Sequence, residues 1–342
     1  MSSNNMYLHD CVNENAFYEI QELDEKNIVS FFEDRGEKDN VLLNAGTVSA
    51  RGGRLPVCGM SNSWFRFKRF VVEQSDTAMK VGTDGVLLGA WARVLPGPAR
   101  YLDIGTGTGV IALMLAQRTE DVPGGATVDA VEVDGAGAVQ AAANAASSPW
   151  SHAVRVYRCG IGIFRPGVSE PLWGGRDVAS VPDGGEETAA GDCSEEGESA
   201  TVPPELLYHH IVSNPPWFVD SLPSPHAGRR VARHADSLPY GELLQHAARL
   251  LAPEGLFSVV LPADSEERFL AGARVAGFGL NRRTRVFTLP GISPKRVLLE
   301  FAFAGSCGAM PVEDTLTIET GEGSGSYTDE YRRLTGDFYL RF

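Results

Sequence analysis

The chain has 342 residues and a formal net charge of −14, from 30 Lys and Arg residues against 44 Asp and Glu residues. Three segments, residues 1–60, 165–207 and 305–342, hold 27 of the acidic and 10 of the basic residues. The rest of the chain holds 17 acidic and 20 basic residues, so its net charge is slightly positive and a nucleic-acid partner is not excluded. A hydrophobic content of 43% excludes a wholly disordered chain, and no apolar run approaches the roughly 20 residues that span a bilayer.

Residues 1–59 are weakly patterned and show no catalytic spacing. We expect an N-terminal extension here, with the functional polypeptide beginning at Met60. The chain starts without a basic stretch followed by an apolar one, and its five cysteines are scattered without CxxC spacing. These features predict a cytoplasmic protein without disulfides, a metal site or membrane association, and a monomer is the default expectation.

An alternation of strands and helices begins after Pro98, which is the pattern of a parallel sheet covered by helices. Five strands are predicted at residues 99–104, 127–133, 153–159, 209–214 and 255–262, with helices at 110–118, 136–146, 238–251 and 265–277. Two further segments, 283–289 and 295–303, need only a short hairpin to form a closing antiparallel pair. The predicted domain, residues 60–304, is therefore an α/β, Rossmann-like sheet of seven strands, five parallel plus a terminal antiparallel hairpin, with helices on both faces.

Two segments do not follow this alternation. Residues 165–207 are rich in Gly, Pro, Ser and acidic residues, a composition that buries too little apolar surface to offset its ordering entropy. We expect a flexible acidic insert there. Residues 305–342 are expected to form a C-terminal extension that packs on the core.

A glycine-rich turn joins the first strand of the domain to its helix, in the sequence Asp103-Ile104-Gly105-Thr106-Gly107-Thr108-Gly109. Glycines let backbone amides approach a ligand closely, and a helix that starts directly after them attracts polar or anionic groups. The GxGxG spacing, with an acid two positions before the first glycine, favours S-adenosyl-L-methionine over a dinucleotide, for which GxGxxG is typical. The residues expected to bind this cofactor are Asp103, Gly105, Gly107 and Gly109.

Glu132 stands at the end of the second predicted strand. A carboxylate at this place can accept hydrogen bonds from both ribose hydroxyls of a bound nucleoside. Glu132 is therefore predicted to hold the cofactor ribose, and Asp134 is the weaker candidate.

The fourth predicted strand ends in Asn214-Pro215-Pro216-Trp217, at the edge where open α/β sheets bind ligands. Two prolines fix the backbone and remove two donors, which leaves carbonyl oxygens free to accept. The side-chain oxygen of Asn214 and the carbonyl of Pro215 could then accept both hydrogens of a planar exocyclic amine and direct its lone pair at a methyl donor. Trp217 would stack on the heterocycle. These three residues are the predicted catalytic group.

Together these motifs resemble class I S-adenosylmethionine-dependent methyltransferases that act on planar amines, and more narrowly the tRNA1(Val) adenine-37 methyltransferase family. The resemblance covers residues 61–342 apart from the insert, and its most specific part is MKVGTDGVLLGAW, from Met79 to Trp91. It implies transfer of a methyl group from S-adenosyl-L-methionine to the exocyclic amine of the adenine 3′ of the anticodon, position 37 of tRNA1(Val). It also implies that the wall of the cofactor pocket includes Lys80, Gly82, Thr83 and Asp84.

The sequence departs from that family after the third strand. Such enzymes usually place an acid there against the cofactor's adenine amine, whereas this chain has Cys159-Gly160-Ile161-Gly162. Trp217 replaces the commoner Tyr or Phe but keeps a π face for stacking.

Basic residues cluster near the catalytic group and beside the closing hairpin, where an RNA backbone would need positive charge. Residues 208–304 hold 8 acidic and 11 basic residues. A target base in a stem-loop would have to be splayed out to reach Trp217. A solvated charged face is the alternative reading of this cluster. The predicted RNA-binding residues are Arg229, Arg230, Arg233, Arg282, Arg283, Arg285, Lys295 and Arg296.

Other functions stay open on the sequence alone. Similar motifs serve enzymes that methylate guanine or adenine amines of ribosomal RNA, or glutamine amides of release factors, although the Ile-Pro-Arg-Pro segment of the latter is missing from this sequence. A non-catalytic RNA-binding module on the same fold is favoured only by the missing acid after the third strand. An NAD-dependent dehydrogenase is disfavoured by the GxGxG spacing.

Overall fold

The computed structural model of the chain divides into two compact units, Met1–Ser63 and Trp64–Phe342. It describes residues 63–75, 77, 79–173, 202–216, 240–308, 310–323 and 325–342, and upstream of these only the backbone of three short strands. These strands form an antiparallel sheet in chain order: β1 (Val41–Asn44), β2 (Thr47–Ala50) and β3 (Gly53–Pro56). Met60 lies outside the described residues, and the larger unit holds all the predicted motifs.

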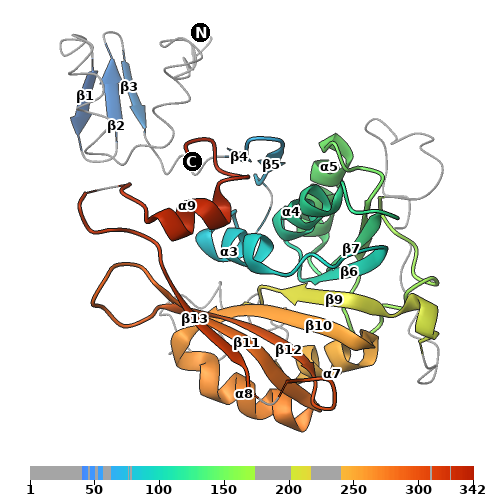
Figure 1. The fold of residues 1–342 in the computed structure, drawn as a ribbon. Helices are drawn as coiled ribbons and strands as arrows, with labels where there is room; N and C mark the ends of the chain where they lie inside the picture. Colours follow the sequence, from blue (N-terminus) through green and yellow to red (C-terminus); the bar gives the residue numbers. More distant parts are fainter. Residues whose placement is uncertain are drawn as a thin grey trace, which may run out of the picture. The chain divides into compact units, whose positions relative to one another are not determined.

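The larger unit is built on one eight-stranded sheet with the order β13-β11-β12-β10-β9-β6-β7-β8 (Figure 1). Five neighbouring strands are parallel, namely β8 (Val154–Arg158), β7 (Ala126–Glu132), β6 (Ala99–Ile104), β9 (Tyr208–Ser213) and β10 (Leu251–Pro262). β12 (Arg296–Phe303) runs antiparallel to both β10 and β11 (Phe278–Phe287). The predicted parallel strands and closing hairpin are therefore confirmed.

The sheet has one strand more than the seven predicted. β13 (Val312–Thr317) pairs in parallel with β11, from Val312 opposite Arg282 to Thr317 opposite Phe287. Its sequence, VEDTLT, is mostly polar and its first four residues are exposed, so no apolar alternation marks it as a strand. Backbone pairing with the edge of an existing sheet supplies the strand conformation instead.

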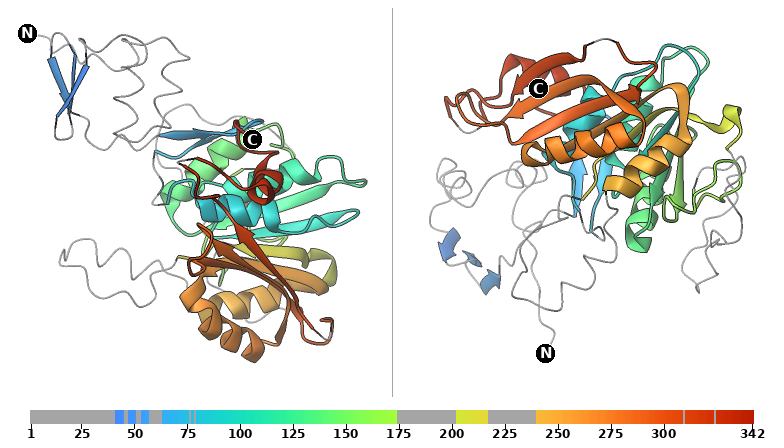
Figure 2. Two further views of the ribbon diagram at one scale, coloured as in Figure 1. Left: turned by 60° about the vertical axis from the view of Figure 1, so that its left-hand side comes forward. Right: turned by 90° about the horizontal axis from the view of Figure 1, so that it is seen from below.

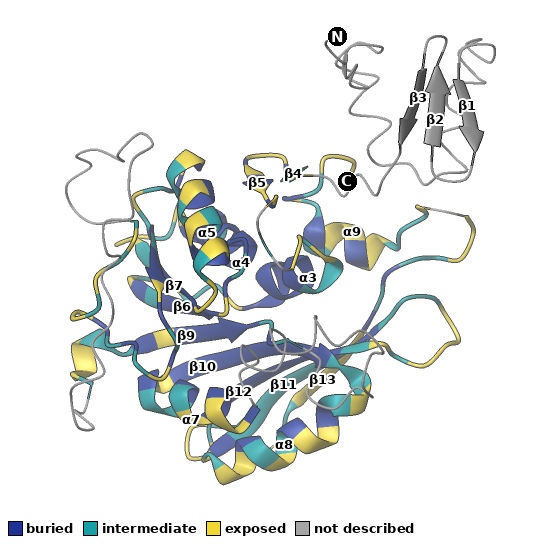
Figure 3. Cartoon of the chain, turned by 180° about the vertical axis from the view of Figure 1, so that it is seen from behind, coloured by how far each residue is buried: buried dark blue, intermediate teal, exposed yellow. Residues whose placement is uncertain are grey.

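Helices cover both faces of the sheet, as predicted (Figures 1 and 2). One face packs against α4 (Val110–Thr119) and α5 (Gly135–Ser147), and the other against α7 (Tyr240–Leu250) and α8 (Glu266–Val275). The short 3-10 helix η5 (Ala263–Ser265) leads into α8. Because both faces are covered, the central strands are buried along most of their length, and the exposed residues lie on the outer sides of the helices (Figure 3).

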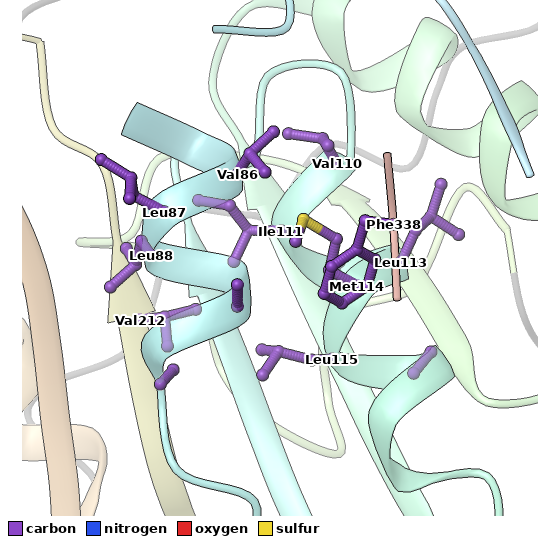
Figure 4. Close-up of a cluster of buried hydrophobic side chains, with 14 of the residues drawn as sticks. Val86, Leu87, Leu88, Val110, Ile111, Leu113, Met114, Leu115, Val212 and Phe338 are labelled. Carbon is purple, nitrogen blue, oxygen red and sulfur yellow. The ribbon is translucent and has the colours of Figure 1, made fainter. Parts of the chain in front are cut away.

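A nine-residue helix, α3 (Thr83–Trp91), packs beside α4 where no helix was predicted. Its last seven residues are all buried, so the segment lacks the polar face by which a surface helix is recognised. Figure 4 shows Val86 and Leu88 of this helix in one cluster with Ile111 and Met114 of α4 and Val212 of β9. The segment that most specifically resembles the family thus forms a core helix.

The chain after β13 returns to the face that carries α3. α9 (Asp329–Thr335) begins after Thr328, whose Oγ1 accepts from the amide of Tyr331 at 3.2 Å. Tyr331 and Phe338 are buried in the same cluster as α3 and α4. Aromatic rings link this segment to the hairpin of β4 (Trp64–Arg66) and β5 (Val71–Glu73), since the rings of Phe67 and Tyr339 stack with centroids 6.1 Å apart.

The first flank of the predicted acidic insert pairs with the edge of the sheet. Trp173 forms an antiparallel bridge with Val156 of β8, and the Leu172 amide donates to the Val156 carbonyl at 2.7 Å. The 3-10 helix η3 (Pro204–Leu206) leads into β9. The expectation of a flexible acidic insert over residues 165–207 stays a prediction. Residues 174–201 of the insert lie outside the described residues.

Candidate active site

The glycine-rich turn lies between β6 and α4, at the carboxyl edge of the parallel strands. Gly105, Gly107 and Gly109 have φ angles of 71°, 57° and 84°, in the left-handed region that favours glycine. The amides of Gly105 and Thr106 donate to the Val131 carbonyl of β7 at 2.9 and 3.1 Å. A Cβ added at Gly105 or Gly107 would meet no described atom within 4 Å. The turn is thus held by the neighbouring strand on one side and borders open space on the other.

Glu132, the last residue of β7, reaches this turn with its side chain. Its Oε2 accepts from the Gly107 amide at 2.8 Å, and its Oε1 accepts from the Asp134 amide at 2.9 Å. Burial raises the pKa of Glu132, whereas the two backbone donors oppose that shift. Asp134 instead caps α5, because its Oδ2 accepts from the Gly137 amide at 2.7 Å. The structure therefore leaves Glu132 as the carboxylate next to the glycines.

Asp103 lies beneath the turn and is fully buried. Its Oδ2 accepts from the Thr106 hydroxyl at 2.5 Å, and its Oδ1 has no hydrogen-bond partner among the described residues. Burial raises the pKa of Asp103 to about 7, although the Thr106 hydroxyl and the Ala112 amide oppose the shift. Asp103 thus supports the turn from below, out of contact with solvent.

Asn214 and Pro215 follow β9 at the same edge of the sheet. β9 pairs with β6 up to Ser213 opposite Ile104, so Asn214 comes level with the start of the glycine turn. The Ser213 hydroxyl donates to the Ile104 carbonyl at 2.8 Å and fixes this junction. Pro215 is buried, and the Oδ1 atom of Asn214 is buried without a partner among the described residues. Trp217 lies outside the described residues.

The segment from Lys80 to Asp84 enters α3 beside the first turn of α4. Gln74 holds its backbone, because the Gln74 Oε1 accepts from the Val81 amide at 2.8 Å. Lys80 and Gly82 are exposed, whereas Asp84 forms an ion pair with Arg296. Burial raises the pKa of Asp84, and the Arg296 guanidinium opposes the shift. Asp84 therefore meets a basic side chain of the closing hairpin.

Most described members of the predicted RNA-binding set are held by carboxylates. Arg282 stacks over the Trp91 ring at 3.6 Å and pairs with the fully buried Glu300 at 3.4 Å, and burial lowers its pKa. The remaining pairs are Arg283 and Arg285 with Glu266 and Glu313, and Arg296 with Asp84. Lys295 is exposed and has no ion pair within the described part of the chain. Arg229, Arg230 and Arg233 lie outside it.

Two polar residues that the motifs did not single out organise the site. Gln74 is one of them. The other is the buried Asn144 of α5, which bridges the hairpin of β4 and β5 and the glycine turn. Its Nδ2 donates to the carbonyls of Glu73 and Thr108 at 2.8 and 2.9 Å, and its Oδ1 accepts from the Glu73 amide at 2.8 Å. A single amide side chain within the alanine-rich run AAANAA was the available signal for this role.

Two negative findings apply to the described residues. They hold no group of three or more His, Cys, Asp or Glu side chains that could bind a metal ion. They also contain no helix with the length and apolar character to cross a membrane.

The strand order, the glycine turn after β6, the acid that ends β7 and the Asn-Pro-Pro that follows β9 define a class I S-adenosylmethionine-dependent methyltransferase. No family model matches the chain. It is 42% identical over 282 residues to the tRNA1(Val) (adenine(37)-N6)-methyltransferase of Phocaeicola vulgatus, which covers 82% of this chain and 99% of the relative. The enzyme of that name from Klebsiella pneumoniae is 38% identical over 277 residues, 81% of this chain and 94% of the relative. The chain therefore belongs to the tRNA1(Val) (adenine(37)-N6)-methyltransferase family.

Among solved structures, a predicted O-methyltransferase from Agrobacterium tumefaciens is similar at 17% identity, with a TM-score of 0.49. The match covers 75% of this chain and 96% of that one.

Proposed function

We propose that the chain transfers the methyl group of S-adenosyl-L-methionine to the N6 amine of adenine 37 in tRNA1(Val), the substrate in the names of its relatives. The observation that carries this proposal is the buried Oδ1 of Asn214 beside the glycine turn, which accepts no hydrogen bond from the described residues. Buried acceptors are almost always paired, and a donor from a ligand at this edge of the sheet would pair this one. The exocyclic amine of adenine offers two N–H donors.

The carboxyl edge of the sheet fits S-adenosyl-L-methionine. Gly105 and Gly107 border open space, so a ligand can lie directly against their backbone. The Gly107 and Asp134 amides orient the Glu132 carboxylate at this edge, where it would accept from the ribose hydroxyls. When bound, S-adenosyl-L-methionine supplies an electrophilic methyl group on a sulfonium centre.

In the proposed mechanism, Asn214 and Pro215 select and orient the amine. Asn214 Oδ1 and the Pro215 carbonyl each accept one N6 hydrogen, which turns the nitrogen lone pair out of the ring plane. The nitrogen would become positively charged as its bond to the methyl carbon forms and the sulfur–methyl bond breaks, which leaves the cofactor as a neutral thioether, and the two acceptor oxygens would stabilise that charge. One of the two N6 protons then leaves to water, which gives neutral N6-methyladenine.

The RNA contacts are proposed from the sequence motifs and, among the described residues, from the basic side chains outside the ion pairs. Trp217 would stack on the target adenine, and Arg229, Arg230 and Arg233 would contact the phosphate backbone. Among the basic residues of the closing hairpin, the exposed Lys295 is also proposed to contact the RNA. Arg282 and Arg283 instead form ion pairs with carboxylates of the protein itself. A tRNA substrate implies a cytoplasmic enzyme.

The proposed catalytic unit is residues 60–304 together with the C-terminal extension, residues 305–342. Residues 1–59 would be dispensable for methyl transfer. A protein that begins at Met60 should therefore keep the activity of the full chain, and a large loss of activity would assign a catalytic role to the extension.

The reaction is tested on tRNA from a strain that lacks the gene. Nucleoside mass spectrometry should show loss of N6-methyladenosine at the position 3′ of the anticodon, and unchanged modification would reject the substrate. With the purified protein, Asn214→Ala should lower kcat by at least about 100-fold with little change in the affinity for S-adenosyl-L-methionine. Asn281→Ala is the matched control, because the Asn281 amide bonds to Glu300 and lies outside the proposed site. An active Asn214→Ala enzyme would remove Asn214 from the mechanism.

A further inference from the structure

The carboxyl end of α3 is capped by side chains from three other elements. Arg118 of α4 donates through Nη1 to the carbonyls of Gly89 and Ala92 at 2.8 and 2.6 Å. Arg282 of β11 donates to the Trp91 carbonyl at 2.9 Å, and Nδ1 of His210 on β9 lies 3.0 Å from the Arg93 carbonyl. Carbonyls at a helix end have no partner within the helix, so these groups satisfy acceptors that would otherwise be unpaired.

The three capping side chains differ in burial, since Arg118 and Arg282 are partly buried. His210 is fully buried and its pKa is lowered to about 3, so it is neutral at physiological pH. Its Nδ1–H therefore donates to the Arg93 carbonyl, and its Nε2 accepts from the Ser258 hydroxyl at 2.9 Å. Arg118 and Arg282 place positive charge at the negative end of the helix dipole. Buried Glu300 faces Arg282 and also pairs with Arg93 at 3.1 Å.

The side of α3 is fixed against α4 by two glycines one helical turn apart. A Cβ on Gly85 would lie 3.3 Å from Val110 Cγ1, and one on Gly89 would lie 2.7 Å from Met114 Sδ. The second distance is shorter than real Cβ contacts, so a larger residue at position 89 would require the Met114 side chain or the helix to shift. Arg118 belongs to α4 itself and binds the far end of α3. One helix therefore fixes the other at both ends.

We propose that Arg118 is a positioning residue for the cofactor pocket, which acts by setting the place of α3 relative to the glycine turn. The inference rests on the proposed function. α4 begins directly after Gly109, and α3 begins directly after the segment Lys80 to Gly82. A shift of α3 along α4 would move that segment relative to the turn, and the pocket between them would lose its shape. A nine-residue helix is too short to hold this position by itself.

The inference is tested by isothermal titration of the full chain with S-adenosyl-L-methionine, alongside thermal unfolding and tRNA binding. Arg118→Gln should weaken cofactor binding about tenfold, because small misplacements in a site have effects of this size, and should leave the affinity for tRNA unchanged. Arg118→Lys, which keeps a donor cation, should recover most of the loss. Gly89→Ala, which crowds Met114 at the contact between α3 and α4, should also weaken binding, and Gly241→Ala, whose Cβ would meet no described atom within 4 Å, should not.

Arg155→Gln is the control for loss of stability alone. Arg155 of β8 bonds to Asp129 of β7 at 2.6 Å, and neither residue belongs to α3, α4 or the glycine turn. This variant should unfold at a lower temperature and bind the cofactor as the wild type does. Wild-type affinity in Arg118→Gln, or an equal loss in Arg118→Gln and Arg155→Gln, would overturn the positioning role and leave the proposed function intact. A wild-type protein that binds no S-adenosyl-L-methionine would reject the proposed function and this inference together.

Discussion

The carboxyl group of Asp103 makes the stability of the fold depend on pH in a calculable way. The side chain is fully buried and its pKa is raised to about 7, whereas an Asp in an unfolded chain has a pKa of about 3.9. The folded state therefore binds more protons than the unfolded state between about pH 4 and pH 7. It follows that this group lowers the free energy of unfolding as the pH rises through that window.

Asp103→Asn removes the titration, while the amide oxygen can still accept from the Thr106 hydroxyl. With these two pKa values, Asp103 lowers the free energy of unfolding by about 2.5 kcal/mol between pH 5 and pH 8. The Asn variant should therefore be more stable relative to the wild type at pH 8 than at pH 5, by about 2.5 kcal/mol. Urea unfolding of the full chain at both pH values, followed by circular dichroism, measures this difference.

Comparison of the two proteins cancels other titrating groups. His210, for example, has its pKa lowered to about 3 and destabilises the fold as the pH falls below about 6.5, but it is present in both proteins. Asp129→Asn is a control with another buried carboxylate, whose loss breaks bonds to Arg155 and Tyr208 and should destabilise at both pH values. An equal effect of Asp103→Asn at pH 5 and pH 8 would show that Asp103 is already ionised at pH 5 and refute the reasoning.

Three further substitutions test the site and the core around it. Glu132→Gln should weaken binding of S-adenosyl-L-methionine about tenfold in calorimetry, because the NH2 group of the glutamine cannot accept from the backbone donors. Unchanged affinity would mean that Glu132 does not contact the ribose. Glu300→Gln should lower the free energy of unfolding by about 3 kcal/mol in urea, since the partly buried Arg282 loses its charged partner. Phe338→Ala should cost a similar 3–5 kcal/mol, and a cost below about 1 kcal/mol would mean that the C-terminal segment adds little to the core.

The sequence predicted those parts of the site whose structure is formed within one short segment of the chain. The run from Ala99 to Gly109 predicted strand, turn and helix, and the structure has all three in that order. α3 was missed because its glycines and its apolar residues on every side give no helical period. β13 was missed because it owes its conformation to the neighbouring strand and not to its own residues.

The electrostatic environment of the basic residues could not be predicted from their neighbours in the chain. Arg296 and its partner Asp84 are separated by 212 positions, and Arg283 and Glu313 by 30. The clustering of arginines near the closing hairpin suggested free positive charge, but the sheet brings distant carboxylates to the same place. Charge along a sequence is therefore a poor guide to charge on a surface when strand pairing joins distant segments.

The two outermost strands of the sheet bear on how this protein avoids aggregation. An open strand edge invites pairing with another chain, and proteins deter such pairing by covering the edge or by placing charge on it. At β8 the backbone amide and carbonyl of Val156 already form hydrogen bonds with Trp173 and Leu172, from the flank of the acidic insert. At β13, the outermost described strand on the other side, Asp314 is exposed and acidic, whereas the exposed Glu313 pairs with Arg283 and Arg285. Two of the segments that make the chain acidic thus supply features of the kind that deter strand pairing at the two ends of the sheet.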